Sequence, residues 1–194
     1  MMIGALAMAI LLTAALAAYR FTTRFSIRTA NDVYPFLLNV DMEALNGTFH
    51  PEAEEEFRNR HSPEEFKRVQ WKRIHLAIHY CDKLSHNARV FYGWTKFERR
   101  VNWEQLEPEL QQAINLLRDA SAQCRTASLV IRLCLRWWLL RMQLLPFAPP
   151  PTFKTLLRLG SAELISFYEN ARTLAEAYSM VYGESYHQKL IQAL

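Results

Sequence analysis

The order of hydrophobic and polar residues divides the chain into an apolar start and a series of helical segments. Residues 2–18 carry no charged side chain, whereas the rest of the chain repeats apolar positions with the 3.6-residue period of a helix. Only five glycines occur, and the eight prolines stand mainly at segment boundaries. We therefore predict an all-α fold, with an N-terminal transmembrane helix followed by a helical bundle built on a long antiparallel helical hairpin.

The apolar start predicts a transmembrane anchor over residues 1–20. As a helix, this run would cover about 26 Å, close to the roughly 30 Å hydrocarbon core of a bilayer. Arg20, Arg24 and Arg28 follow the run and no Lys or Arg precedes it, so the positive-inside rule places the N-terminus outside and the C-terminal domain in the cytoplasm. These arginines would also attract an anionic leaflet. The small-x-small pattern at residues 15–17 is typical of a signal-peptide cleavage site, so export after cleavage is the alternative to the predicted anchor.

Start and stop signals organise the rest of the chain. Residues 21–61 are expected to hold short juxtamembrane helices, one of them a docking helix that begins at Asn31 or Asp32 and stops at Gly47. Residues 62–194 are expected to form the helical bundle, with main helices at 62–100, 107–145 and 152–182.

The boundaries of these main helices depend on a few residues. Ser62, Pro63 and Glu65 form the signature of a capping box at the start of the first helix. We place the start of the second at Glu107 or Pro108, and its short connection to the first predicts an antiparallel hairpin. The third helix is expected to be interrupted at residues 160–161 and closed by Gly183, with a short helix after it.

The helix predicted at 107–145 has a heptad pattern. One apolar line recurs every seven residues, and small residues three positions later would complete an a/d seam. The first line contains Leu110, Leu117, Cys124, Ile131, Trp138 and Leu145, and the second contains Ala113, Ala120, Ala127 and Cys134.

A line of arginines runs along the opposite side of the same helix, within an arc of about 40°. It predicts a binding surface for a partner protein or for anionic lipid, with two adjacent tryptophans near its end. The candidate residues are Arg118, Arg125, Arg132, Arg136, Trp137 and Trp138.

Residues 132–145 are apolar enough to suggest a second membrane span. Three arginines at the bilayer centre would cost about 2.5–3.5 kcal/mol each, whereas nine Leu, Ile and Val residues would return only about 0.3–0.6 kcal/mol each. We therefore predict no span here. Two interpretations stay open: a core helix with one arginine-lined wet edge, or a helix that lies in the membrane interface.

A second candidate site lies on the helix predicted at 62–100. His75, His79, Asp82 and His86 are spaced by four, three and four residues, so their side chains project from one face. Imidazoles four residues apart can share a metal ion, which makes a metal-binding bundle or metalloenzyme the alternative function. The opposing interpretation is a solvated polar face.

Charge and motifs exclude several classes of protein. The net charge of +4 is too weak to indicate nucleic-acid binding. The sequence has no phosphate-binding loop, dinucleotide fingerprint or nucleophile elbow, and we predict no cofactor and no evident catalytic activity. The three cysteines, Cys81, Cys124 and Cys134, form no CxxC pair and are expected to be buried thiols in a reducing compartment. The sequence thus favours a membrane-anchored interaction or scaffold protein, with oligomer formation left open.

Overall fold

A computed structural model describes residue 27 and residues 29–50, 52–145, 148–158 and 160–194, and every regular element within them is a helix. The predicted all-α bundle is therefore confirmed. The α-helices are α2 (Met42–Phe49), α3 (Glu52–Arg60), α4 (Pro63–Val101), α5 (Pro108–Leu144), α6 (Phe153–Arg158), α7 (Ser161–Ser179) and α8 (Glu184–Ala193). Short 3-10 turns are η1 (Ala30–Asp32), η2 (Tyr34–Phe36), η3 (Trp103–Gln105) and η4 (Met180–Tyr182).

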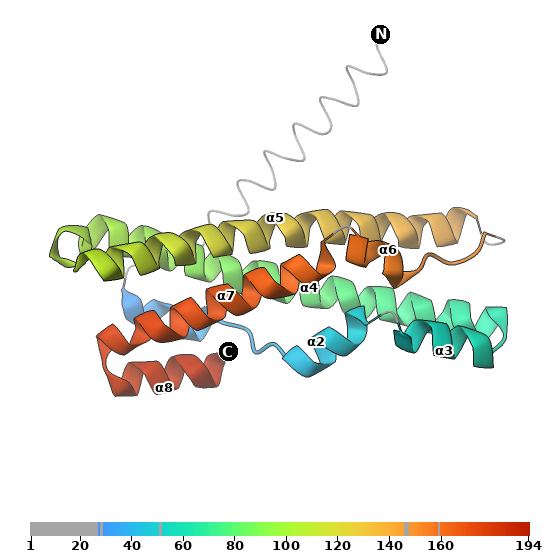
Figure 1. Cartoon of the computed structure of the whole chain (residues 1–194), viewed down its shortest axis with the longest axis horizontal. Helices are drawn as coiled ribbons and strands as arrows, with labels where there is room; N and C mark the ends of the chain where they lie inside the picture. Colours follow the sequence, from blue (N-terminus) through green and yellow to red (C-terminus); the bar gives the residue numbers. More distant parts are fainter. Residues whose placement is uncertain (1–26, 28, 51, 146–147, 159) are drawn as a thin grey trace, which may run out of the picture.

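The long helices α4 and α5 form an antiparallel hairpin that runs the length of the molecule (Figure 1). Helix α7 packs along α5 and crosses the hairpin, and α8 folds back beneath α7. Helices α2 and α3 cover the other side of α4 (Figure 1). This arrangement encloses one continuous core with Trp94, Phe91 and Tyr168 among its largest fully buried side chains.

The helix boundaries follow the local signals closely. Ser62 Oγ accepts a hydrogen bond from the Glu65 amide, and Glu65 Oε2 accepts one from the Ser62 amide, which is the predicted capping box. Helix α5 begins at Pro108 as expected, because proline has no amide hydrogen and the first helical position needs none. The predicted interruption lies at Gly160, whose φ of 95° separates α6 from α7, and Gly183, with a φ of 90°, separates η4 from α8.

The prediction of a docking helix that begins at Asn31 or Asp32 and stops at Gly47 is wrong. The chain makes two 3-10 turns, continues without regular structure, and then enters α2, where Asp41 caps Ala44 and Gly47 lies inside the helix. Long-range hydrogen bonds explain why this segment is not a helix. Asn87 on α4 accepts a hydrogen bond from the Leu38 amide at 2.8 Å and donates one to the Leu38 carbonyl at 2.7 Å, so the extended backbone is paired without a helix.

The seam of α5 is partly different from the one predicted. The first apolar line is correct at Leu117, Cys124, Ile131 and Trp138, which are buried. The second buried line lies four residues after it, not three, because α7 packs on that side as well as α4. This second line consists of Ser121, Ser128, Leu135 and Met142. Of the predicted second line only Ala120 is buried, whereas Ala113, Ala127 and Cys134 are half-buried; in the first predicted line Leu110 is half-buried and Leu145 is exposed.

The described residues cover only part of the membrane predictions. The predicted anchor and its alternative, cleavage of a signal peptide, fall on residues that the structure does not describe, as do the arginines that follow: residues 1–20, Arg20, Arg24 and Arg28. Within the described part of the chain, no helix combines the length and the hydrophobicity that a membrane crossing requires.

Two of the three cysteines are fully buried. Burial raises the pKa of the Cys81 and Cys124 thiols to about 12, and Cys134 is half-buried. All three are free thiols, as expected for cysteines used as small core residues.

Candidate functional site

The predicted arginine line does lie along one edge of α5, but its members have different surroundings. Arg118 Nη2 is 3.4 Å from Asp119 Oδ1 on the same helix. Arg132 reaches across to α4 and donates to Asp82 Oδ1 at 2.5 Å. Arg136 is exposed. The line is therefore not one uniform surface.

The two adjacent tryptophans, which project about 100° apart from α5, differ in exposure. Trp137 is 60% exposed, the highest value of any aromatic side chain among the described exposed hydrophobics. Trp138 is buried and meets Phe153 edge-on, with ring centroids 5.9 Å apart. Trp138 is thus a core residue of the α5–α6 contact, and the prediction that it belongs to a binding surface is not supported by its position.

A surface pocket of about 350 Å³ lies between α4 and α5, beside the arginine line. Arg125 and Arg132 line it from α5, and Arg89 joins them from α4. The remaining lining residues are Ser85, Tyr92, Ala122, Thr126 and Leu129. We name this feature the arginine pocket.

Sequence reasoning missed Arg89, because it belongs to a different helix from the arginine line. The available signal was weak: Arg89 lies three residues after His86, just beyond the histidine face, and nothing local distinguishes it from a solvated side chain. Only the register of the hairpin brings it beside Arg125 and Arg132.

The arginine pocket concentrates positive charge. Burial lowers the pKa of Arg89, and the nearby charges of Arg125 and Arg132 lower it further. The Arg125 guanidinium lies 5.4 Å from the centre of the Tyr92 ring, and Lys96 Nζ lies 5.0 Å from the same ring. The residues that line the pocket, all of them in the described part of the chain, include no carboxylate. An anion would therefore find guanidinium donors and a net positive charge there.

The exposed face of α5 carries a continuous apolar surface next to this pocket. At 100° per residue, six exposed apolar side chains lie within an arc of about 100° along the C-terminal half of the helix. We name these residues the apolar strip: Leu129, Val130, Leu133, Trp137, Leu140 and Leu144.

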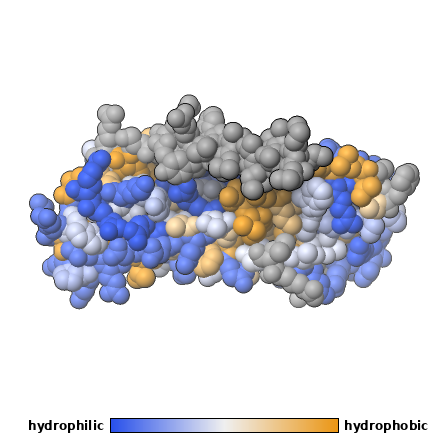
Figure 2. Space-filling model, turned by 90° about the horizontal axis from the view of Figure 1, so that it is seen from above, coloured by the Kyte–Doolittle hydropathy of each residue, from blue (hydrophilic) through white to orange (hydrophobic). Residues whose placement is uncertain are grey.

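Arginines flank the apolar strip, and the strip is confined to the C-terminal half of α5. Arg125, Arg132 and Arg136 follow one edge, and Arg141 lies at the other. On the N-terminal half of α5, the same face carries polar residues such as Asp119 instead. Figure 2 looks down on this side of the molecule and shows a large hydrophobic area near its middle and another toward its right-hand end.

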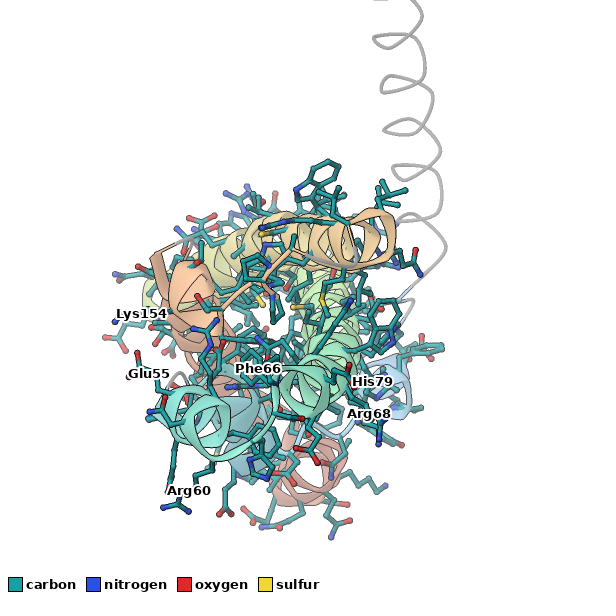
Figure 3. The ribbon with its side chains drawn as sticks, turned by 90° about the vertical axis from the view of Figure 1, so that its right-hand side faces the viewer. Glu55, Arg60, Phe66, Arg68, His79 and Lys154 are labelled. Atoms are coloured by element: carbon teal, nitrogen blue, oxygen red, sulfur yellow. The ribbon has the colours of Figure 1, made fainter. Side chains whose placement is uncertain are left out.

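The histidine face does not come together as a metal site. Asp82 pairs with Arg132, and His86 Nε2 lies 2.7 Å from the carbonyl oxygen of Phe36. His75 and His79 are exposed, and His79 points away from the bundle on the outer side of α4 (Figure 3). Among the described residues, no three His, Cys, Asp or Glu side chains are placed to hold one metal ion.

Glu98, near the C-terminal end of α4, is the centre of a second polar cluster. Its carboxyl group accepts hydrogen bonds from Trp94 Nε1 at 2.8 Å, from Asn102 Nδ2 at 2.9 Å and from the Tyr178 hydroxyl at 3.0 Å. The Tyr182 hydroxyl donates to it as well. Burial, followed by the negative charge of Glu98, raises the pKa of Tyr178. This buried cluster ties α7 and η4 to α4, and it is satisfied without any ligand.

Glu54 is the centre of a similar buried polar cluster at the other end of the molecule. It accepts a hydrogen bond from the Phe153 amide at 2.7 Å and one from Gln70 Nε2 at 3.1 Å, and Arg73 lies 3.8 Å away. Burial raises its pKa despite these partners. At the surface above it, Glu55 and Lys154 face each other across α3 and α6 (Figure 3). These contacts hold α3 and α6 in place.

No family model, curated protein or solved structure matches this chain.

Proposed function

We propose that this protein is a membrane-associated helical binding protein whose helix α5 rests on the bilayer surface through the apolar strip. The observation that carries the proposal is the coincidence, on one helix, of six exposed apolar side chains and arginines along both edges. An interfacial helix has this pattern, because its apolar face enters the acyl boundary while its cationic edges meet the headgroups.

Details of the strip support a lipid surface over a protein partner. Trp137 stands in the middle of the strip, and tryptophan prefers the membrane–water interface. The cations beside the strip, three at one edge and Arg141 at the other, are all arginines, whose long apolar stems reach over lipid while the guanidinium groups stay at headgroup level. The expected anchor at residues 1–20 would keep the domain close to such a surface, and it remains part of the proposal.

The test uses the full-length chain reconstituted in vesicles that contain phosphatidylglycerol. A spin label is placed at position 133 by Leu133→Cys, with Cys134 replaced by alanine so that the remaining thiols are buried. We expect the label to be accessible to oxygen, which partitions into the bilayer, and protected from a water-soluble nickel complex.

The matched control is Leu116→Cys in the same background. Leu116 is 50% exposed and Leu133 is 57% exposed, and both lie on α5, but Leu116 belongs to its polar half. Its label should remain accessible to the nickel complex. Equal nickel accessibility at both positions would contradict the proposal. Protection of position 133 from both the nickel complex and oxygen would indicate a protein contact instead of a bilayer.

A further inference from the structure

The arginine pocket and the apolar strip meet at one residue. Leu129 lines the pocket and is also the first member of the strip, and it is 45% exposed. A ligand with an anionic head and an apolar tail could therefore place its head among the arginines and continue along the strip without crossing polar surface.

The geometry points to an anionic phospholipid as this ligand: we propose that the arginine pocket binds the phosphodiester of a lipid headgroup between α4 and α5. The choice of lipid as the source of the phosphate rests on the proposed function, because it needs the strip to lie on a bilayer. The pocket itself is argued independently from its own residues.

Three arginines from two helices provide the binding chemistry. Guanidinium groups match the oxygens of phosphate with paired N–H donors, and such charge-assisted bonds are about twice as strong as neutral ones. Arg125 and Arg132 are separated by two helical turns, about 10 Å along the axis, and Arg89 stands on the facing helix. Asp82 pairs with Arg132 at the edge, so the charge of the group remains positive.

The neighbouring polar groups add weaker donors and fix the cations in place. Ser85 and Thr126 bring hydroxyl groups to the lining, although Thr126 Oγ1 also donates to the Ala122 carbonyl at 3.0 Å. The Tyr92 ring holds Arg125 on one side and Lys96 nearby. A volume of about 350 Å³ has room for a phosphate with the first atoms of its glycerol groups.

The position of the pocket relative to the strip agrees with a headgroup. On the helical wheel, Arg125 and Arg132 lie about 90° from the centre of the strip. When the strip faces the acyl chains, residues at this angle are at the depth of the phosphates. A soluble phosphate metabolite would gain nothing from the strip, whereas a lipid gains from both surfaces.

The experiment is native mass spectrometry of the full-length chain in uncharged detergent, titrated with phosphatidylglycerol or phosphatidylcholine. We expect one retained phosphatidylglycerol per chain and at least tenfold weaker retention of phosphatidylcholine. Arg125→Gln and Arg89→Gln, one from each helix, should each weaken phosphatidylglycerol retention about tenfold or more.

Arg100→Gln is the matched control. It removes the same charge from an exposed position on α4 that neither lines the pocket nor flanks the apolar strip, and we expect phosphatidylglycerol retention within about twofold of the unsubstituted chain. Circular dichroism and thermal unfolding establish that each variant is folded. Arg125→Lys, which keeps the charge but loses the paired donors, should give an intermediate loss and remains informative where a glutamine variant does not fold.

Several outcomes would overturn the inference. Equal losses in Arg100→Gln and Arg125→Gln would mean diffuse surface charge without a pocket. Retention of phosphatidylcholine equal to that of phosphatidylglycerol would remove the anion requirement. Calorimetric binding of inorganic phosphate as tight as that of the lipid would identify a free-phosphate site instead.

The two proposals fail separately. A water-exposed label at position 133 with selective phosphatidylglycerol retention would remove bilayer contact by the strip and leave a pocket for phosphate esters. A membrane-buried label with no effect of Arg125→Gln would leave the strip and remove the pocket.

Discussion

Helix α4 carries two polar clusters, and they differ in how their charges are balanced. Around Glu98, one carboxyl group receives hydrogen bonds from Trp94, Asn102, Tyr178 and Tyr182, and the group is closed to solvent. The arginine pocket gathers three cations beside a single carboxylate and is open to solvent. A cluster that satisfies its own charge stabilises the fold, whereas one that keeps a net charge beside an open cavity is suited to a ligand.

The largest effect is expected from Glu98→Ala. The substitution leaves four donors without their acceptor, and each of the two buried ones, Trp94 and Tyr178, costs about 1–3 kcal/mol when it finds no other partner. We expect the free energy of unfolding to fall by about 3 kcal/mol or more, measured by urea denaturation. A loss below about 1 kcal/mol would show that the Glu98 cluster contributes little to stability.

Alkaline pH should lower the free energy of unfolding through the Glu98 cluster and not through the arginine pocket. Burial and the charge of Glu98 raise the pKa of Tyr178 and of Tyr182 in the folded chain. The unfolded chain therefore releases these protons first, near pH 10, and unfolding becomes easier as pH rises above that value.

Each such tyrosine is expected to lower the free energy of unfolding by up to about 1.4 kcal/mol per pH unit above pH 10. Urea denaturation between pH 8 and 11 measures this slope, and Tyr182→Phe should make it shallower. A difference in tyrosinate absorbance between the unsubstituted chain and Tyr182→Phe that appears well before unfolding would contradict the raised pKa of Tyr182.

The smallest effect on stability is expected from Arg125→Gln. The variant loses the contact with the Tyr92 ring, worth about 0.5–1 kcal/mol at an exposed site, but it also relieves repulsion with Arg89. We expect the free energy of unfolding to change by less than about 1 kcal/mol, measured by the same urea denaturation. A loss as large as that of Glu98→Ala would show that the arginine pocket stabilises the fold as the Glu98 cluster does. The proposed difference between the two clusters would then be wrong.

Local rules predicted most helix boundaries, because their causes are local. The capping box at Ser62, the proline start of α5 and the break at Gly160 each depend on a few adjacent residues. The segment before α2 was predicted wrongly because its backbone is paired by Asn87, 49 residues away from Leu38. No local pattern could reveal that pairing.

The candidate site was predicted in part. The arginine line is a property of one helix and follows from a seven-residue spacing, so Arg125 and Arg132 were found. Trp138 was assigned to the surface because sequence cannot tell which of two adjacent tryptophans faces Phe153. The histidine face was correctly placed on one side of α4, but its Asp82 is paired with Arg132 from the neighbouring helix.

The sequence by itself determined that the described chain is helical, where its long helices begin and end, and that one edge of α5 is cationic. Those properties come from backbone capping, proline and glycine geometry, and helical periodicity. Only the tertiary structure decided which apolar residues of α5 are covered and which remain as the apolar strip. It also brought Arg89 beside Arg125 and Arg132, because charges on two helices become one site only when the register of the hairpin brings them together.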